Sequence, residues 1–369
     1  MIFMRITLLI GSLTGGGAER VVCHLANYLA KQQHIVEILT VSDKISYKPN
    51  DNVRLRNMYH ESNSKLPKKI INIIRLYRFN KYLRKENVDL YVTFLPELTQ
   101  LLMRQKFFFK APVVISERSD PYQYWEKGRN QLCVFKKYFS RGDGYVFQTE
   151  EARLYYSTNG IDTRNSIVIP NAINPDFVKE PYIGKHEKEI VSVGRLNIPK
   201  NFPLLIRAFA KISEKHQDYI LKIYGQGGLL ESLKKLTREL GVEEKVEFPG
   251  YVNDIPKALQ KASLFVLSSH YEGMPNALAE AMSLGLPCIS TDCPVGGPRF
   301  LINEEENGIL VPVDDDDALA DAIERVLNNE DLKEKLGKNA RHISERLSSD
   351  KIYNMWEEFL VRTANNKNR

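Results

Sequence analysis

The sequence predicts a two-domain α/β protein in which each domain holds a parallel β-sheet covered by helices. The first observation is the length of 369 residues, which exceeds what one ordinary hydrophobic core supports. The second is the alternation of short apolar runs with longer helical patterns, which is typical of strands joined by crossover helices. The third is a polar break at residues 174–188, rich in proline, glycine and charged residues.

The apolar runs give the expected strands in order. Those of the first half are 5–11, 34–41, 53–58, 89–95, 112–118, 144–149 and 166–169, and those of the second are 189–195, 219–225, 245–250, 263–269, 287–291 and 309–313. Helical patterns separate most of them, most clearly at 18–31, 202–216, 229–240 and 318–328. We therefore expect two Rossmann-like domains, at 1–175 and 189–349, with a linker at 176–188 and a last helix, 350–369, that could cross back. Two such domains would face each other across a ligand-binding cleft.

Composition and charge limit the class of protein. The chain is 43% hydrophobic and 27% charged, which is typical of a globular protein. Residues 1–180 hold 27 of the 52 basic residues but only 17 of the 46 acidic ones, so the two halves should have different partners. No apolar run is long enough for a membrane span, and Arg5 interrupts the only run that resembles a signal peptide. The four scattered cysteines predict reduced thiols rather than disulfides or a zinc site.

Candidate binding residues directly follow strands of the second half, where open α/β sheets bind ligands. They are Gly194, Arg195 and Lys200; Tyr224 and Gly225; Tyr251 and Val252; and Glu272, Gly273, Met274, Pro275, Asn276, Ala277, Leu278 and Glu280. Pro275 suits the first turn of a helix, so the next three residues should present backbone N–H groups to a diphosphate. Glu272 and Glu280 would accept hydrogen bonds from a sugar and a ribose. Arg195 and Lys200 would stabilise the charge of a departing diphosphate.

Plainer interpretations exist for each of these residues. Glu272 could be a surface acid, Arg195 and Lys200 could be solvated loop charges, and the two tyrosines could serve only packing. The acidic run 314–317 directly precedes a helical pattern, which favours helix capping over a metal site. The joint placement of the candidates at successive strand ends is what favours a ligand site.

These residues resemble the donor site of family 4 glycosyltransferases, a large retaining group with the GT-B fold. The family has two glutamates separated by seven residues, and Glu272 and Glu280 match them. Arg195 and Lys200 resemble its phosphate-binding pair, and residues 281–287 and 307–311 fit its C-terminal pattern. The resemblance covers essentially the whole chain. It implies a nucleotide-sugar donor, and the choice of uridine rests on the resemblance alone.

Two loops of the first half also fit the resemblance. Gly16 and Gly17 match a loop whose backbone contacts the transferred sugar, its phosphate or the acceptor. Arg118 stands where many members have a histidine that contacts the donor sugar. This Ser-Glu-Arg-x-Asp-Pro version is similar to the exopolysaccharide and capsule branch, including amylovoran-type galactosyltransferases. A buried structural pair of Glu117 with Arg118 is the alternative.

A basic segment at residues 65–85 holds eight Lys and Arg residues and no acidic one. Its apolar residues Ile70, Ile73, Ile74, Tyr77 and Leu83 can form one helical face. One interpretation is a core-packed helix with a solvated basic face. The other is a helix that binds an anionic membrane surface, with contacts from Lys68, Lys69, Arg75 and Arg78. No nucleic-acid-binding motif accompanies the charge.

The resulting hypothesis is a retaining glycosyltransferase of bacterial surface polysaccharide synthesis. It would move a hexose or N-acetylhexosamine from a UDP-sugar to a lipid-linked glycan, with no metal and no cofactor. It would work in the cytoplasm at the inner face of the membrane. Two alternatives stay open: a nucleotide-sugar 2-epimerase of the same fold, and a non-catalytic membrane-associated partner subunit.

Overall fold

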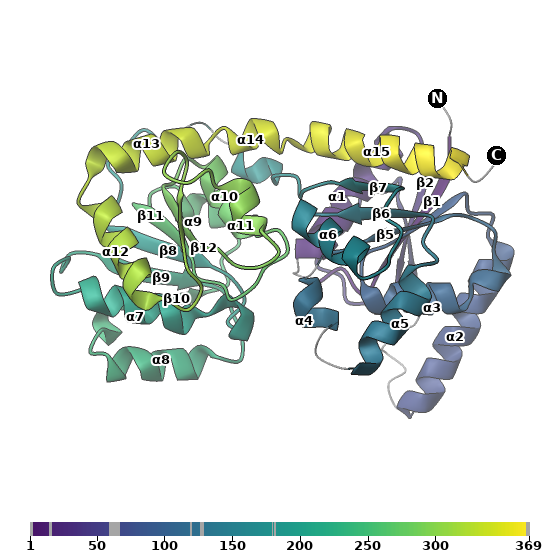
Figure 1. Ribbon diagram of the computed structural model, residues 1–369, viewed down its shortest axis with the longest axis horizontal. Coiled ribbons are helices and arrows are strands. Elements are labelled where there is room, and N and C mark those ends of the chain that lie inside the picture. The colour runs from purple at the N-terminus through teal and green to yellow at the C-terminus, as the bar shows by residue number, and fades with distance from the viewer. Residues whose placement is uncertain are drawn as a thin grey trace. The chain divides into compact units, whose positions relative to one another are not determined.

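The chain forms two compact units, each built on one parallel sheet with helices on its faces (Figure 1). The computed structural model describes residues 3–14, 17–58, 67–118, 120–125, 129–178, 180 and 182–366. One unit comprises residues 1–171 with 350–369, and the other comprises residues 172–349. The two Rossmann-like domains expected from the sequence are confirmed.

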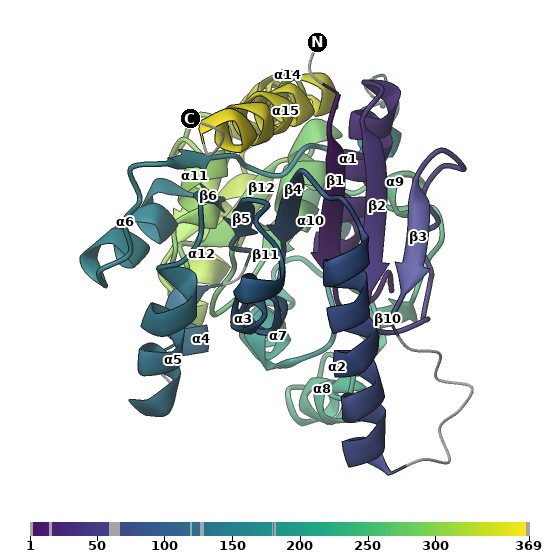
Figure 2. The ribbon, with the colours of Figure 1, turned by 90° about the vertical axis from the view of Figure 1, so that its right-hand side faces the viewer.

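The first sheet has the strand order β3-β2-β1-β4-β5-β6-β7. Its strands are β1 Arg5–Ile10, β2 Ile35–Thr40, β3 Arg54–Asn57, β4 Leu90–Thr93, β5 Val113–Ser116, β6 Gly144–Phe147 and β7 Ser166–Val168. Its helices are α1 Gly17–Lys31, α2 Lys68–Lys85, α3 Pro96–Arg104, η2 Lys106–Phe108, α4 Pro121–Trp125, α5 Arg129–Phe139, α6 Glu150–Thr158 and α15 Ser349–Asn366. Figure 2 shows α2, α3 and α5 next to one another along this unit.

The last helix, α15, packs on the first unit. Trp356 is fully buried there, with its ring 5.8 Å from that of Phe94, and the ring of Tyr353 lies 5.7 Å from that of Tyr28 in α1. Phe359 is buried beside Gly144, where an added Cβ would lie 3.1 Å from its ring. The core of the first sheet therefore includes residues from both ends of the chain.

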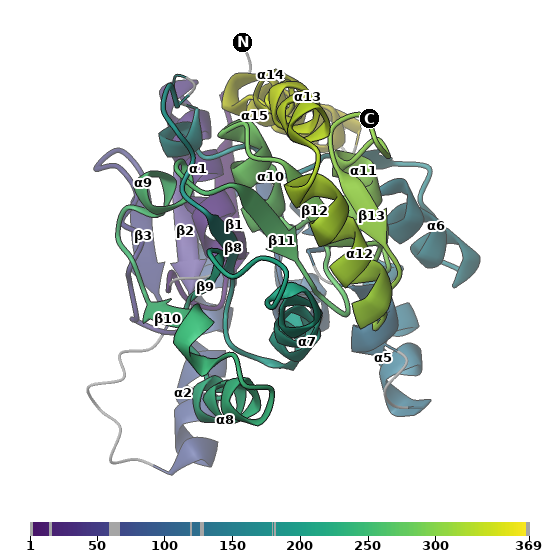
Figure 3. The same ribbon diagram turned by 90° about the vertical axis from the view of Figure 1, so that its left-hand side faces the viewer.

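The second sheet has the order β10-β9-β8-β11-β12-β13 (Figure 3). Its strands are β8 Glu189–Val193, β9 Ile220–Tyr224, β10 Val246–Gly250, β11 Leu264–Leu267, β12 Cys288–Thr291 and β13 Ile309–Val311. Its helices are η3 Pro175–Phe177, η4 Ile198–Lys200, α7 Phe202–Ile212, α8 Leu230–Glu239, η5 Glu243–Lys245, α9 Ile255–Leu259, α10 Asn276–Ser283, α11 Gly297–Leu301, α12 Asp316–Leu327, α13 Glu330–Ala340 and α14 Ile343–Arg346.

The chain enters the second unit earlier than the sequence predicts. The unit begins at residue 172, whereas we expected the first domain to run to 175 and a linker to follow at 176–188. The reason is that Ile173 and Phe177 are buried. The backbone N–H of Ile173 donates to Leu347 O at 2.9 Å, and Phe177 O accepts from Ser283 Oγ at 3.2 Å. Two apolar residues in a polar stretch thus anchor the segment.

The strand order reverses at one place in each sheet. The reversal lies between β1 and β4 in the first sheet and between β8 and β11 in the second. At such a point the connecting helices leave toward opposite faces, so the loops beyond the carboxyl ends of the two strands leave room for a ligand. These are the loops that carry most of the candidate residues.

Candidate active site

The loops after β8 and β11 bring two of the predicted residues, Lys200 and Glu272, into contact. Because these strands are neighbours in the sheet, Lys200 in η4 meets Glu272, with Nζ 2.5 Å from Oε1. Ser269 Oγ donates to the same carboxylate oxygen at 2.7 Å. The side chains of Lys200 and Glu272 are 21% and 14% exposed, so the pair is largely covered but still reaches solvent. Arg195 lies in the same loop as Lys200 and is exposed.

A second set of contacts holds these two loops to each other. Ser268 Oγ donates to Lys200 O at 3.0 Å, and the backbone N–H of His270 donates to Pro199 O at 2.8 Å. Asn201 adopts the left-handed conformation, with φ 45°, and donates to Asp314 Oδ1 at 2.8 Å. That carboxylate also lies 3.0 Å from His270 Nδ1. Sequence reasoning missed the roles of Asn201 and His270, although asparagine is a residue that tolerates this conformation.

The acidic run 314–317 divides between two roles. Asp315 is the N-cap of α12, and its side chain accepts from Ala318 N at 2.8 Å. The capping prediction is therefore confirmed for Asp315, with Asp316 and Asp317 in the first turn of the helix. Asp314 is the exception, because it joins the network of His270 and Asn201.

Helix α10 begins one residue later than predicted. Pro275 is its N-cap, with ψ 95°, rather than part of the first turn. The proline φ of −76° fits either position, so only ψ decides between them. The first intrahelical bond runs from Ala279 N to Pro275 O, and no side chain caps the end. The N–H groups of residues 276–278 thus still precede the first bond, at the positive end of the helix dipole.

The glycines of this edge serve close packing of the strand ends. Gly194 N donates to Tyr224 O, and Gly225 N donates to Gly250 O. A Cβ on Gly225 would lie 1.9 Å from Gly194 O, and its φ of +138° is unfavourable for other residues. Gly273 O would lie 2.0 Å from a Cβ on Gly297. Gly225 and Gly297 are therefore needed whether or not a ligand binds, because a Cβ at either position would collide with backbone.

The remaining predicted donor residues differ in exposure. Tyr224 is buried, and burial raises the pKa of its phenol, which supports the packing interpretation for this residue. Tyr251 is 72% exposed and available to a ligand, and Val252 beside it is half-buried. Within α10, Glu280 is 7% exposed and Leu278 is fully buried, while Met274 and Pro275 are buried ahead of it. Gly273 and Ala277 are half-buried.

In the first unit, Arg118 follows β5 and is held by neutral groups. Its Nε donates to Ser116 Oγ at 2.9 Å and its Nη1 to Asn171 Oδ1 at 2.6 Å. The guanidinium lies 5.2 Å from the ring centroid of Trp356 and 5.7 Å from that of Phe94. Burial lowers the pKa of Arg118 to about 10. A cation in contact with two aromatic rings is favourable despite this desolvation.

The carboxylate of the neighbouring Glu117 accepts one hydrogen bond from backbone and one from a tyrosine. Its Oε1 accepts from the backbone N–H of Arg118 at 2.9 Å, and its Oε2 accepts from Tyr156 Oη. The two residues are therefore linked by this backbone hydrogen bond, and the charge of Glu117 also acts on the guanidinium, as the structural-pair alternative expects. Gly17 is the first residue of α1, beyond the end of β1, whereas Gly16 lies outside the described residues.

Helix α2 does not bury the apolar face that its sequence suggests. Leu83 is buried and Ile74 half-buried, but Ile70, Ile73 and Tyr77 are 42%, 67% and 66% exposed. Lys69 and Arg78 are exposed on the same helix, and Arg75 is half-buried. The side chain of Lys68 lies outside the described residues. The core-packed interpretation is therefore wrong for the N-terminal half of α2.

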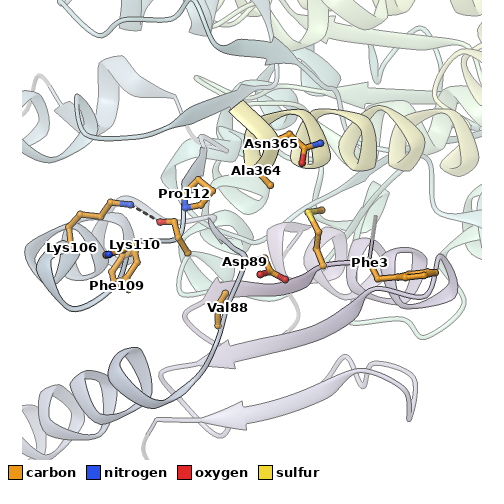
Figure 4. Close-up of a pocket in the computed structure, with 11 residues that line it drawn as sticks. Phe3, Val88, Asp89, Lys106, Phe109, Lys110, Pro112, Ala364 and Asn365 are labelled. Atoms are coloured by element: carbon orange, nitrogen blue, oxygen red, sulfur yellow. Dashed lines mark hydrogen bonds between the residues drawn. The ribbon is translucent and has the colours of Figure 1, made fainter. Parts of the chain in front are cut away.

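A cavity of about 680 Å³ lies at the opposite, amino-terminal edge of the first sheet (Figure 4). Lys106 and Phe109 line one side of it and Phe3 the other. Lys106 Nζ donates to Ala111 O at 2.7 Å and lies 3.2 Å from Asp143 Oδ2, so its charge is already paired. The position of the cavity at the amino-terminal edge sets it apart from the carboxyl strand ends, where such sheets bind ligands.

The described part of the chain contains neither a membrane-spanning helix nor a cluster of metal ligands. None of its helices is both long enough and apolar enough to cross a membrane. Within the same residues, no group of three or more His, Cys, Asp and Glu side chains is placed to hold a metal ion.

Comparisons with known proteins agree with this geometry. Residues 15–177 match the family described as Glycosyltransferase Family 4, and residues 174–343 match Glycosyl transferases group 1. A sucrose-phosphate synthase from Thermosynechococcus elongatus shares the fold with a TM-score of 0.84 at 21% identity, over 97% of this chain and 98% of its own. HepE from Anabaena, solved with UDP and glucose, gives 0.81 at 17% identity, over 97% and 100%. The fold is therefore GT-B.

Two curated relatives are similar in sequence. The GalNAc-α-(1→4)-GalNAc-α-(1→3)-diNAcBac-PP-undecaprenol α-1,4-N-acetyl-D-galactosaminyltransferase of Campylobacter jejuni is 27% identical, over 99% of both chains. The UDP-Gal:α-D-GlcNAc-diphosphoundecaprenol α-1,3-galactosyltransferase of Escherichia coli is 34% identical, over 49% of this chain and 50% of its own. Fold, site and relatives together define a glycosyltransferase. The chain belongs to glycosyltransferase family 4.

Proposed function

We propose that this glycosyltransferase moves a hexose or N-acetylhexosamine from a UDP-sugar to a lipid-linked glycan, with retention of configuration. The observation that carries the proposal is the Lys200–Glu272 pair beside the uncapped start of α10, at the strand-order reversal of the second sheet. A helix N-terminus with a nearby cation suits a diphosphate, and a carboxylate suits sugar hydroxyls. The relatives that act on undecaprenol-linked glycans, one of them named for UDP-Gal, support the acceptor and donor classes.

The reaction needs no protein nucleophile in this scheme. The bond between the anomeric carbon and the diphosphate oxygen breaks while the acceptor oxygen bonds to the same face of that carbon. The acceptor proton passes to an oxygen of the departing UDP. Lys200, Arg195 and the α10 N–H groups stabilise the charge that develops on the leaving group. We further propose that no metal is required, because these groups already supply positive charge.

A donor panel tests the enzymatic proposal. Incubation with UDP-, GDP- and ADP-sugars, with and without prenyl-diphosphate-linked glycans, should release UDP and glycosylate the lipid acceptor in the presence of EDTA. The linkage in the product, assigned by NMR, should keep the anomeric configuration of the donor. Glu272→Ala should lower transfer about 100- to 1000-fold, by analogy with loss of one transition-state contact. Epimerised nucleotide sugar with no transfer would instead identify a 2-epimerase.

We also propose that the protein works at the cytoplasmic face of the membrane, through α2. The exposed Ile70, Ile73 and Tyr77 share this helix with Lys69 and Arg78. Apolar side chains next to cations are typical of helices that lie in the surface of an anionic bilayer. Each cation near such a surface contributes about 1 kcal/mol of binding free energy.

Liposome flotation tests this attachment. The wild-type chain should float with vesicles that contain phosphatidylglycerol and not with neutral phosphatidylcholine vesicles. Charge reversal at Lys69 and Arg78, with or without Lys68 and Arg75, should abolish flotation, whereas Lys257→Glu on the second unit should not. Flotation that is indifferent to lipid charge, or that survives the reversal, would refute attachment through α2.

A further inference from the structure

The groove between α3 and α5 of the first unit holds side chains that the proposed reaction does not use. A cavity of about 270 Å³ lies there. Aromatic and other apolar side chains make most of its wall, with two polar ones among them; those used below are Tyr124, Trp125, Tyr138, Glu97 and Gln100. A mainly apolar wall with few polar groups is typical of small-molecule sites, and this volume is below that of pockets for drug-sized ligands. It suits a single sugar ring.

One end of the groove lies at the carboxyl edge of the first sheet. Helix α3 starts at Pro96, shortly after β4 ends at Thr93, and Tyr124 and Trp125 belong to α4, which follows β5. This is the edge at which such sheets bind ligands. The pocket wall is also joined to the Arg118 loop by hydrogen bonds. Trp125 Nε1 donates to Tyr156 Oη at 2.9 Å, and Tyr156 in turn donates to Glu117, the residue before Arg118.

The other end of the groove carries a cluster of cations around Tyr138. The charged groups of Arg104, Lys137 and Arg141 lie 5.4, 5.7 and 5.8 Å from the centroid of its ring. A hydrogen bond from Arg104, with the charges of all three, lowers the pKa of the Tyr138 phenol. Among the described residues, none of the three cations forms an ion pair with a carboxylate. Such a cluster attracts a multiply charged anion.

The two ends therefore differ in chemistry along one helix. Glu97 and Arg104 lie seven residues apart in α3, roughly 10 Å along its axis. Polar and aromatic side chains occur at the end of the groove near the carboxyl edge of the first sheet. The cations, which have no ion-pair partner among the described residues, occur at the other end. A glycan linked to a prenyl diphosphate has the same order of groups, with sugar hydroxyls first and the diphosphate behind them.

We infer that the groove between α3 and α5 anchors the acceptor, with its diphosphate at the Arg104–Lys137–Arg141 cluster and the adjoining sugar ring in the aromatic pocket. This inference rests on the proposed function for the identity of the acceptor. It adds a binding site distinct from the donor site, and it gives the acceptor a direction. The far end of the glycan then extends past the carboxyl edge of β4 and β5.

Diphosphate binding tests the cationic end. Inorganic diphosphate is titrated calorimetrically into the full chain with UDP at saturation, so that the donor site is occupied. The Arg104→Ala/Lys137→Ala/Arg141→Ala variant should bind at least about tenfold more weakly. Lys136→Ala, which removes the adjacent exposed cation of α5, should leave binding unchanged. Equal affinity for the triple variant and the wild type would overturn the assignment, provided that both melt at the same temperature.

The aromatic end is tested with three probes of increasing complexity. Gln100→Leu should leave the affinity for inorganic diphosphate and farnesyl diphosphate unchanged but weaken that for farnesyl-diphosphate-linked N-acetylglucosamine about fivefold or more. Tighter binding of farnesyl diphosphate to this variant would show that the pocket takes the isoprenoid and would overturn the sugar assignment. No effect on any probe would do the same.

The experiments distinguish an error in the proposed function from an error in the assignment of the groove as the acceptor site. If the function is wrong, the wild-type chain releases no UDP from any donor in the panel. If only the groove is wrong, UDP release without acceptor stays normal in all variants and the affinities for the probes do not change. The groove variants should therefore raise the KM for the lipid acceptor and leave donor hydrolysis intact.

Discussion

The carboxyl edges of the two sheets position a basic residue in opposite ways. In the second unit, Lys200 is paired with Glu272 and both side chains reach the surface. In the first unit, Arg118 is held by the neutral oxygens of Ser116 and Asn171 and by two aromatic rings. The two residues of an ion pair can exchange each other for a ligand when one binds. A buried cation that is held by neutral hydrogen-bond acceptors and aromatic rings stays in place. We therefore expect the contacts at the carboxyl edge of the second sheet to change when a ligand binds, and those at the carboxyl edge of the first sheet to persist.

At the carboxyl edge of the second sheet, the contacts that can be exchanged are those between Lys200 and Glu272. In the proposed site, the diphosphate of the donor would compete with Glu272 for Lys200, and a sugar hydroxyl would compete with Lys200 for Glu272. The diphosphate would then compensate the charge of Lys200, while sugar hydroxyls would replace the lysine as hydrogen-bond donors to Glu272. The Ser269 hydrogen bond keeps Glu272 in position during the exchange.

The largest expected effect comes from removing the exchangeable cation. Lys200→Ala should lower kcat for transfer about 100- to 1000-fold, or about 2.7–4 kcal/mol, because the leaving group loses a charge contact. UDP release from the donor sugar measures this. Lys211→Ala is the matched control, since that lysine is exposed on α7 and bound to Asp316 and Asp317. If both variants behave alike, Lys200 is an ordinary surface lysine and the comparison fails.

A smaller effect is expected from changing the fixed cation. Arg118→Lys should reduce the free energy of unfolding of the first unit by about 1–3 kcal/mol, because an ammonium group cannot keep both hydrogen bonds and the ring contacts. Tryptophan fluorescence in urea reports this unit selectively, since Trp125 and Trp356 both belong to it. Arg153→Lys, at an exposed arginine of α6, should leave the midpoint unchanged. An unchanged urea midpoint for Arg118→Lys would show that the contacts around Arg118 do not hold the guanidinium in a fixed position.

The smallest expected effect is the chemical modification of the cysteine thiols. Their reactivity reports how accessible each part of the two units is to a reagent. Cys133 is exposed on α5, whereas Cys23, Cys288 and Cys293 are buried. Burial raises the pKa of Cys23 to about 11 and, with the charge of Glu272, that of Cys293 to about 12. Iodoacetamide at pH 8 should therefore modify Cys133 alone, as seen by peptide mass spectrometry. Modification of Cys293 in the native chain would mean that the second edge opens spontaneously.

The same thiols fix the sign of a pH effect. Their pKa in the folded chain exceeds the ordinary value of 9.0, so the folded state holds their protons more tightly than the unfolded state. Their contribution to stability is fully present below pH 9 and is lost as the pH rises toward the folded pKa.

The strand pattern could be predicted because both sheets are buried and parallel. Every expected strand is present. Central strands such as β4, β5 and β11 are covered on both faces and read as continuous apolar runs, whereas the edge strands β3 and β10 alternate in exposure. The positions of Glu272, Lys200 and Arg195 followed from the rule that ligands meet strand ends. Contacts between distant residues could not be read in this way. The link of Asp314 to Asn201 and His270 joins three loops, and no local pattern records it.

The errors have physical causes of their own. Proline satisfies the φ of an N-cap and of a first helical turn equally, which displaced the start of α10 by one residue. The segment 176–188 looked like a linker because the two anchoring residues, Ile173 just before it and Phe177 within it, lie among polar ones. The apolar residues of α2 suggested a core face, but periodicity shows only that such a face exists, not what covers it.

Helix α15 has a consequence for synthesis of the protein on the ribosome. Domains usually fold as they emerge, beginning with the N-terminal one. Here the first unit needs Trp356 and Phe359 from the last helix to complete its core, so its sheet must wait while residues 172–349 are translated. The second unit is continuous in sequence and has no such delay. The part of the chain that is made first is therefore the part that is finished last.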